Sequence, residues 1–148
     1  MGRSGPIDKG GENMKKIIIG GVLAGLVILL TGMVFGALSS EMYKMSPRVF
    51  WKPMGGDWFT KVIIFDLASG LVLACVFSII KGMLPGTGLI KGISFGIIVW
   101  AVGPMLGLTM TYLTMAIRVK LIAVWALNGL VNYCMSGLVF ELLDEKLS

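Results

Sequence analysis

The chain has 148 residues, of which 56% are hydrophobic and only 14% charged, and its mean hydropathy is +0.89. Soluble domains are about 45–50% apolar, so this composition excludes an ordinary soluble protein. The formal net charge is +5 and histidine is absent, which removes the commonest general base and most haem and zinc ligation. We therefore expect no enzyme and no cofactor.

Four apolar stretches are each long enough to cross a bilayer, which takes about 20 residues. They predict an all-α membrane protein with four transmembrane helices at about residues 17–40, 62–80, 89–117 and 121–143. Most charged residues flank these stretches, where membrane proteins contact lipid headgroups. No soluble segment combines a basic face with aromatic side chains, so we expect the lipid bilayer, and not nucleic acid, as the partner.

The first thirteen residues allow two interpretations. Lys15 and Lys16 follow Met14 and precede the first apolar run, as at the start of a bacterial membrane protein. The codons for residues 9–13 can also contain a purine-rich ribosome-binding sequence. Residues 1–13 are therefore either a misassigned start or a disordered glycine-rich tail, and the folded domain is expected at residues 14–148. The apolar run is too long for a typical signal peptide, so we expect it to be retained.

Glycines recur at the same spacing in the first and third stretches. Offsets of 4, 11 and 15 residues place each set on one helix face at about 100° per residue. A glycine stripe lets another helix backbone approach closely, so we expect the first and third spans to meet through their stripes. The glycines are Gly21, Gly25, Gly32 and Gly36 in the first stretch and Gly92, Gly96, Gly103 and Gly107 in the third.

A second motif favours an internal repeat of two up-down helical hairpins. The stripe is shifted by 71 residues, from Gly21 to Gly92, and the sequence Ser-Gly-Leu-Val at residues 69–72 recurs at residues 136–139, a shift of 67. Two such hairpins enter the membrane from the same side and are related by a pseudo-two-fold axis along the membrane normal. Because glycine-rich spans also match by chance, duplication and chance similarity are both open.

The connection at residues 39–61 is the only long one. It mixes aromatic and basic side chains with Pro47, Pro53, Gly55 and Gly56, which interrupt any long helix. This composition is typical of the membrane–water interface, so we expect an interfacial loop, with a lid or partner-docking surface as the alternative. In the third span, Pro104 after a glycine predicts a kink.

Basic residues leave the orientation nearly balanced, with five on the side of the two termini and six on the other when counted from Met14. Lys15 and Lys16 adjoin the first span, which usually dominates the orientation. We therefore expect both termini in the cytoplasm, and the protein in a prokaryotic inner membrane.

A few polar residues within the spans are candidates for function. Asp66 is the only formal charge within residues 17–40, 62–80, 92–117 and 121–140, and such a residue is by default a proton or cation site. Near the start of its span, however, a carboxylate is also stabilised by the helix dipole and by headgroup water. Asn128, Asn132 and Ser136 follow one another at intervals of four. They either form interhelical hydrogen bonds or line a polar path together with Asp66 and Tyr112.

Cys75 and Cys134 lie in predicted spans at similar depths. A buried cysteine usually behaves as a small apolar residue, and we expect this here. A disulfide or a metal pair is the alternative.

A set of short motifs, most of them rich in glycine, proline or tryptophan, lies in spans two to four and their connections. The motifs are residues 84–88, 91–92, 95–96, 103–104, 111–113 and 129–130, together with Trp100 and Trp125. With these residues the chain resembles an uncharacterised family of small four-helix prokaryotic membrane proteins. The resemblance implies the fold and a membrane location. The family has no assigned activity, so no functional residue carries over.

Two functional hypotheses follow. Glycine-striped helices with little polar interior suit helix–helix association, which favours a non-enzymatic scaffold or a small subunit of a membrane assembly. Its protein partners would be further copies of the chain or other membrane subunits. The alternative is a small homo-oligomeric channel or transporter for protons, cations or a small solute. That alternative requires Asp66 or the polar stripe from Asn128 to face a wet cavity.

Overall fold

The computed structural model describes residues 6–44 and 55–146, with the side chains of residues 6–10 left aside. These residues form helices and no strand, which confirms the all-α prediction. The helices are α1 (Pro6–Leu38), α2 (Ser40–Lys44), α3 (Trp58–Ile80), α4 (Leu89–Val102), α5 (Pro104–Thr114) and α6 (Val119–Lys146). The middle of the expected interfacial loop, residues 45–54, lies outside the described residues, as do residues 1–5 of the expected tail.

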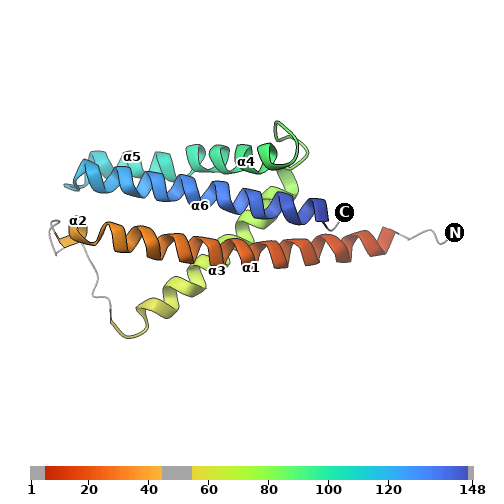
Figure 1. Ribbon diagram of the computed structural model, residues 1–148, viewed down its shortest axis with the longest axis horizontal. Coiled ribbons are helices and arrows are strands. Elements are labelled where there is room, and N and C mark those ends of the chain that lie inside the picture. The colour runs from red at the N-terminus through yellow and green to blue at the C-terminus, as the bar shows by residue number, and fades with distance from the viewer. Residues whose placement is uncertain (1–5, 45–54, 147–148) are drawn as a thin grey trace.

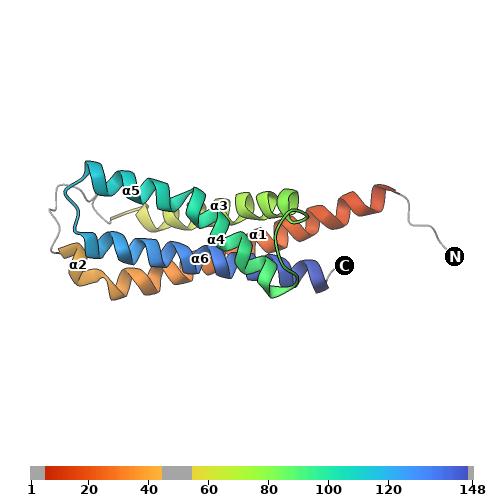
Figure 2. The same ribbon diagram turned by 90° about the horizontal axis from the view of Figure 1, so that it is seen from above.

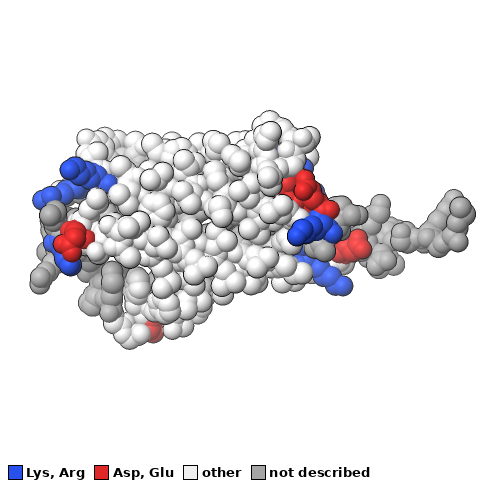
Figure 3. Space-filling model, in the orientation of Figure 1, with Lys and Arg blue, Asp and Glu red and all other residues white. Residues whose placement is uncertain are grey.

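In the part of the chain that the structure describes, four helices are long and apolar enough to cross a membrane, as the sequence predicts. They are Gly11–Leu38, Trp58–Ile80, Leu89–Thr114 and Val119–Lys146. On the face drawn in Figure 3, charged side chains gather towards the two ends and a wide uncharged band separates them. An uncharged band of this kind is what the hydrocarbon core of a bilayer requires.

The helices form two up-down hairpins. The start of α1, the end of α6 and the α3–α4 turn lie at one end of the molecule, and α2 and the α5–α6 turn lie at the other (Figures 1 and 2). Within each hairpin α1 packs on α3 and α4 packs on α6, and α1 on α6 joins the hairpins. Helix α3 crosses α1 obliquely, so that its first half diverges from α6 (Figure 1).

Two helices begin earlier than the apolar stretches suggest. Helix α1 already begins at Pro6. Helix α3 begins at Trp58, so Asp66 is its ninth residue. At 1.5 Å per residue, Asp66 lies about 12 Å along the axis from the start of α3. The carboxylate is therefore deeper in its helix than the sequence suggests.

The prediction that the first and third spans meet through their glycines is wrong. The stripe of α1 faces α3, since a Cβ on Gly21 would lie 2.7 Å from Leu71 Cα and one on Gly25 would lie 2.7 Å from Leu67 Cα. The stripe of α4 faces α6 in the same way, since a Cβ on Gly92 would lie 2.6 Å from the carbonyl oxygen of Gly137. Each seam therefore closes a hairpin, and neither joins the two hairpins.

The remaining stripe glycines do not pack against another helix. Among the described residues, a Cβ on Gly32, Gly36 or Gly107 would meet nothing within 4 Å, and one on Gly103 would meet only the Val99 carbonyl of its own turn. In the first hairpin the reason is the oblique crossing of α3 and α1, which confines close approach to part of their length. Half of the predicted packing glycines thus lie outside the seams.

The predicted kink is present where α4 ends and α5 begins. Gly103 separates the two helices with φ −96° and ψ −88°, and its N–H still donates to the Val99 carbonyl at 3.0 Å. Pro104 has no N–H to continue the helical pattern. The third span is therefore a broken helix.

The buried core lies towards the end that holds the two termini. The rings of Phe77, Phe95 and Phe140 come from α3, α4 and α6, and their centroids are 5.2–5.9 Å apart. Aromatic pairs at this separation are stabilised beyond the burial of their area. This cluster draws the end of α3 towards the second hairpin, whereas the start of α3 has no equivalent contact.

Candidate functional site

The divergence of α3 leaves a groove of about 490 Å³ between α3 and α6. Helix α3 packs closely on α1 and touches α6 only lightly, so the facing sides of α3 and α6 are left apart. Ile28 of α1 and Pro104 of α5 complete the lining. The remaining lining residues are Phe65, Asp66, Ala68, Ser69, Val72 and Leu73 on α3 and Trp125, Asn128, Gly129, Asn132 and Tyr133 on α6.

The structure brings three of the five candidate polar residues into this groove. Asp66 comes from α3, and Asn128 and Asn132 come from α6. Positions four apart share a face of a helix, which explains why both asparagines point to the same side of α6. Asp66 and the two asparagines of the polar stripe thus line one groove.

The two asparagines differ in their hydrogen bonds. Asn132 is 7% exposed, and its Oδ1 accepts a hydrogen bond from the Thr31 hydroxyl of α1. Asn128 Oδ1 is buried and has no partner among the described residues. Asn132 therefore joins the two hairpins, as the interhelical interpretation predicts, while Asn128, which lines the groove, carries a buried acceptor that no described residue satisfies.

Asp66 has no counter-charge among the described residues. No hydrogen bond or ion pair joins it to any of them, and none of those that line the groove is basic. Lys61, one turn earlier on α3, is paired with Asp57 at 2.8 Å, and both side chains are exposed. A carboxylate within a membrane span is costly unless it is paired or reached by water. A bound cation or proton would therefore stabilise Asp66.

Aromatic and aliphatic side chains form the walls of the groove around these polar atoms. Phe65, Trp125 and Tyr133 contribute rings, and Ile28, Val72 and Leu73 contribute aliphatic surface. The Trp125 indole N–H donates to Tyr43 Oη of α2 at 2.6 Å, which fixes the orientation of the ring. The sequence did not predict this bond, since Tyr43 was assigned to the interfacial loop.

Ser136 and Tyr112 do not belong to the groove. Ser136 is fully buried, and its hydroxyl donates to the Asn132 carbonyl of its own helix at 2.8 Å. Tyr112 is exposed and lines a separate, almost wholly apolar hollow of about 440 Å³ between α5 and α6, together with Thr109. The five residues therefore do not line one groove, because α5 and α3 lie against different parts of α6.

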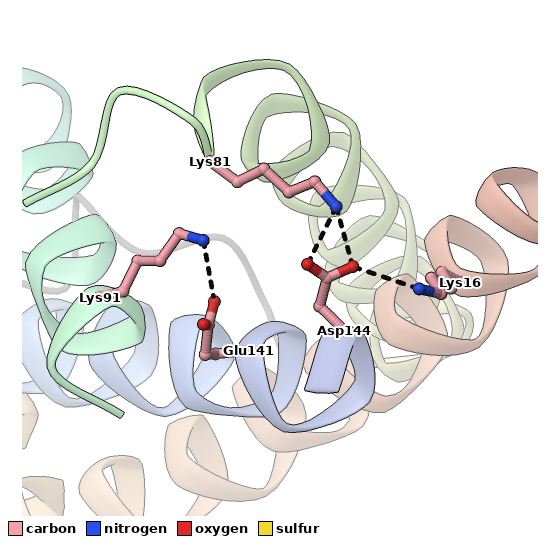
Figure 4. Close-up of polar contacts among 5 residues, drawn as sticks. All are labelled: Lys16, Lys81, Lys91, Glu141 and Asp144. Atoms are coloured by element: carbon pink, nitrogen blue, oxygen red, sulfur yellow. Dashed lines mark hydrogen bonds and ion pairs between the residues drawn. The ribbon is translucent and has the colours of Figure 1, made fainter. Parts of the chain in front are cut away.

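A charged cluster at the end with the two termini was not predicted as a unit. Lys81 Nζ lies 2.8 and 2.9 Å from the two oxygens of Asp144, and Lys16 Nζ lies 3.4 Å from Oδ1 (Figure 4). Lys91 Nζ lies 3.7 Å from Oε2 of the buried Glu141. These cations come from α1, α4 and the residue after α3, so the acidic end of α6 connects all four long helices. In the sequence, this cluster is indicated by oppositely charged residues at the ends of predicted spans that lie on the same side of the membrane.

Cys75 and Cys134 are both free thiols. Cys75 is exposed, while the backbone of Cys134 receives the close approach of Gly96. Within residues 11–44 and 55–146, no group of three or more Cys, Asp or Glu side chains is arranged to hold a metal ion.

Comparisons with protein-family models, with curated proteins and with solved structures find no match to this chain. The resemblance to small four-helix membrane proteins stays a prediction.

Proposed function

We propose that the protein is a multi-pass membrane protein that takes up a small solute or cation in the α3–α6 groove, as a small channel or transporter. The observation that carries this proposal is the convergence of Asp66, Asn128 and Asn132, from two distant helices, on one groove. Unpaired polar groups in membrane spans mark substrate and ion pathways. A purely structural bundle has no use for an unpaired carboxylate beside an unused amide oxygen.

The broken third span supports the same proposal. Pro104, the first residue after the break, lines the groove. Interrupted helices next to a polar site near the middle of the bundle recur in transporters, because bending at the break changes access to the site. The Gly103–Pro104 break would thus set the width of the groove at its α5 side.

Flux into liposomes tests the proposal. Vesicles with the parent protein and empty vesicles are compared for entry of protons, potassium ion, a labelled amine, a labelled carboxylate and a labelled alcohol. We expect the parent to admit at least one probe, and Asp66→Asn to abolish that flux. Asp57→Asn, which removes an exposed carboxylate of the same region outside the groove, is the matched control. A parent that admits no probe beyond empty vesicles contradicts the proposal.

A second candidate function is a scaffold or subunit within a membrane assembly. It is favoured by the open glycines: Gly36 and Gly107 correspond by the shift of 71 residues, and a Cβ on either would meet nothing within 4 Å. Open glycines let the backbone of another helix approach. Purification in mild detergent distinguishes the candidates, since stoichiometric foreign subunits support the scaffold and a pure homo-oligomer supports the transporter.

We further propose that the two hairpins arose by duplication. A Cβ on Gly70 would meet the Gly21 carbonyl, and one on Gly137 would meet the Gly92 carbonyl. Corresponding glycines thus make corresponding contacts in the two seams. For orientation we propose that the end holding both termini is cytoplasmic, because Lys15 and Lys16 lie there, directly before the apolar part of α1.

A further inference from the structure

We propose that the occupant of the α3–α6 groove is a protonated amine with an apolar body, held by Asp66 and Asn128 between aromatic walls. The inference rests on the proposed function in that both place the solute in this groove. It goes further by naming the chemical class of the solute. Three properties of the lining carry it: net charge, the balance of donors and acceptors, and the nature of the walls.

The net charge of the lining selects a cation. Among the described residues, Asp66 is the only formally charged one that lines the groove, and none of them forms an ion pair with it. An anionic solute would meet a like charge in a medium of low dielectric constant, where repulsion is strong. A zwitterionic lipid headgroup brings a phosphate as well, for which the lining offers no basic partner. A small monocation neutralises the charge of the Asp66 carboxylate and leaves no net charge in the groove.

The hydrogen-bonding groups select a donor. Asp66 offers carboxylate oxygens, and Asn128 Oδ1 is buried without a donor. Asn132 Oδ1 is already occupied by the Thr31 hydroxyl. These carboxylate and amide oxygens are acceptors, and an ammonium group supplies up to three N–H donors to them. A quaternary ammonium carries the charge but cannot satisfy Asn128.

The walls select an organic body over a bare metal ion. Hard cations such as Mg²⁺ and Ca²⁺ take about six or more oxygen ligands, while most of this lining is carbon. Phe65, Trp125 and Tyr133 supply three rings, and aromatic faces attract cations and stack on apolar groups. The groove volume of about 490 Å³ lies in the range of about 300–1,000 Å³ usual for small-molecule sites.

Equilibrium binding tests this inference independently of flux. The probe is tritiated 4-phenylbutylamine, dialysed at neutral pH against the full chain in phosphatidylcholine nanodiscs, with empty discs subtracted. We expect saturable binding that weakens at least about tenfold in Asp66→Asn and several-fold in Asn128→Leu, as lost charge-assisted and neutral hydrogen bonds imply. Asp57→Asn should bind as the parent does. Asp66→Glu, which keeps the charge, should bind more tightly than Asp66→Asn.

Neutral and lipid controls decide against the alternatives. 4-Phenylbutanol has the same body without the charge, and its binding as tightly as the amine overturns the inference. Unchanged amine binding in both Asp66→Asn and Asn128→Leu also overturns the inference. Loss of amine binding when phosphatidylethanolamine is added to the discs overturns it as well, because it would assign the groove to a lipid headgroup. Amine binding without flux contradicts only the proposed transport. Flux of another solute without amine binding contradicts only this inference.

Discussion

Asn128 and Asn132 lie one turn apart on α6 and line the same groove, but their amide oxygens have different surroundings. The Thr31 hydroxyl reaches Asn132 Oδ1, whereas Asn128 Oδ1 is buried without a donor. A buried acceptor without a partner costs about 1–3 kcal/mol. The local environment, and not the residue type, therefore separates an asparagine that stabilises the fold from one that destabilises it in the absence of a ligand.

Replacing each asparagine by leucine tests this distinction. We expect Asn128→Leu to raise the stability of the ligand-free protein by about 1 kcal/mol, because the unsatisfied acceptor is removed. We expect Asn132→Leu to lower it by about 0.6–1.7 kcal/mol, the range of interhelical hydrogen bonds in membranes. Thermal unfolding in detergent measures both, and Thr31→Val should match Asn132→Leu. If both leucine variants are destabilised alike, Asn128 has a structural partner.

At the scale of the helix pair, the glycine seams show how one residue type can have two outcomes. Gly96 of α4 lies against the backbone of Cys134, whereas Gly107 of α5 faces open space. Both belong to the same span and to the same stripe. Close approach of backbones is thus a property of where two helices cross, and the stripe alone does not locate the crossing.

The matched pair Gly96→Ala and Gly107→Ala separates these roles. A methyl group at residue 96 forces α4 and α6 apart, so we expect a loss of about 1–3 kcal/mol or more, as for overpacked cores. The same methyl group at residue 107 meets nothing, and alanine's higher helix propensity should add up to about 1 kcal/mol. Folded yield and thermal unfolding in detergent report both. Equal destabilisation of the two variants would show that Gly107 is also packed, for example in an oligomer.

The sequence predicted the positions of the helices better than it predicted which helices pack against one another. Span positions follow from the length of apolar runs, and the break follows from Pro104 because proline lacks an N–H. Which helix a glycine stripe faces is different, because the stripe of Gly21 and Gly25 fits any backbone that comes near it. The crossing of α3 and α1 is decided by tertiary contacts such as the phenylalanine cluster, which no local pattern encodes.

The candidate site was predictable in part for the same reason. The spacing of Asn128 and Asn132 already places them on one face, and Asp66 stands out as a charge in an apolar run. Their meeting depends on the divergence of α3, and so does the exclusion of Tyr112. The pairing of Lys81 with Asp144 was not predicted because it joins helix ends far apart in the sequence.

For the whole molecule, the two ends of the bundle differ in how firmly the helices are held together. At the end with the termini, the phenylalanine rings and the charged cluster connect α3 to the second hairpin (Figure 4). At the other end, α3 diverges from α6 (Figure 1), and the groove lies between these two helices. Asp144 is central to the closed end because its two oxygens contact lysines of the first hairpin while it belongs to the second.

Neutralising Asp144 should therefore loosen the closed end and leave the groove lining intact. We expect Asp144→Asn to destabilise the protein by about 1 kcal/mol, a value in the range for hydrogen bonds to charged groups after allowance for the partial exposure of this carboxylate. Amide exchange should rise near residues 77–81 and 140–146, but not at residues 125–132, which line the groove. Glu145→Gln, which removes the adjacent exposed carboxylate, should melt as the parent does. If Asp144→Asn also melts as the parent does, the aromatic cluster alone holds α3 to the second hairpin, and the charges at this end serve the headgroup region instead.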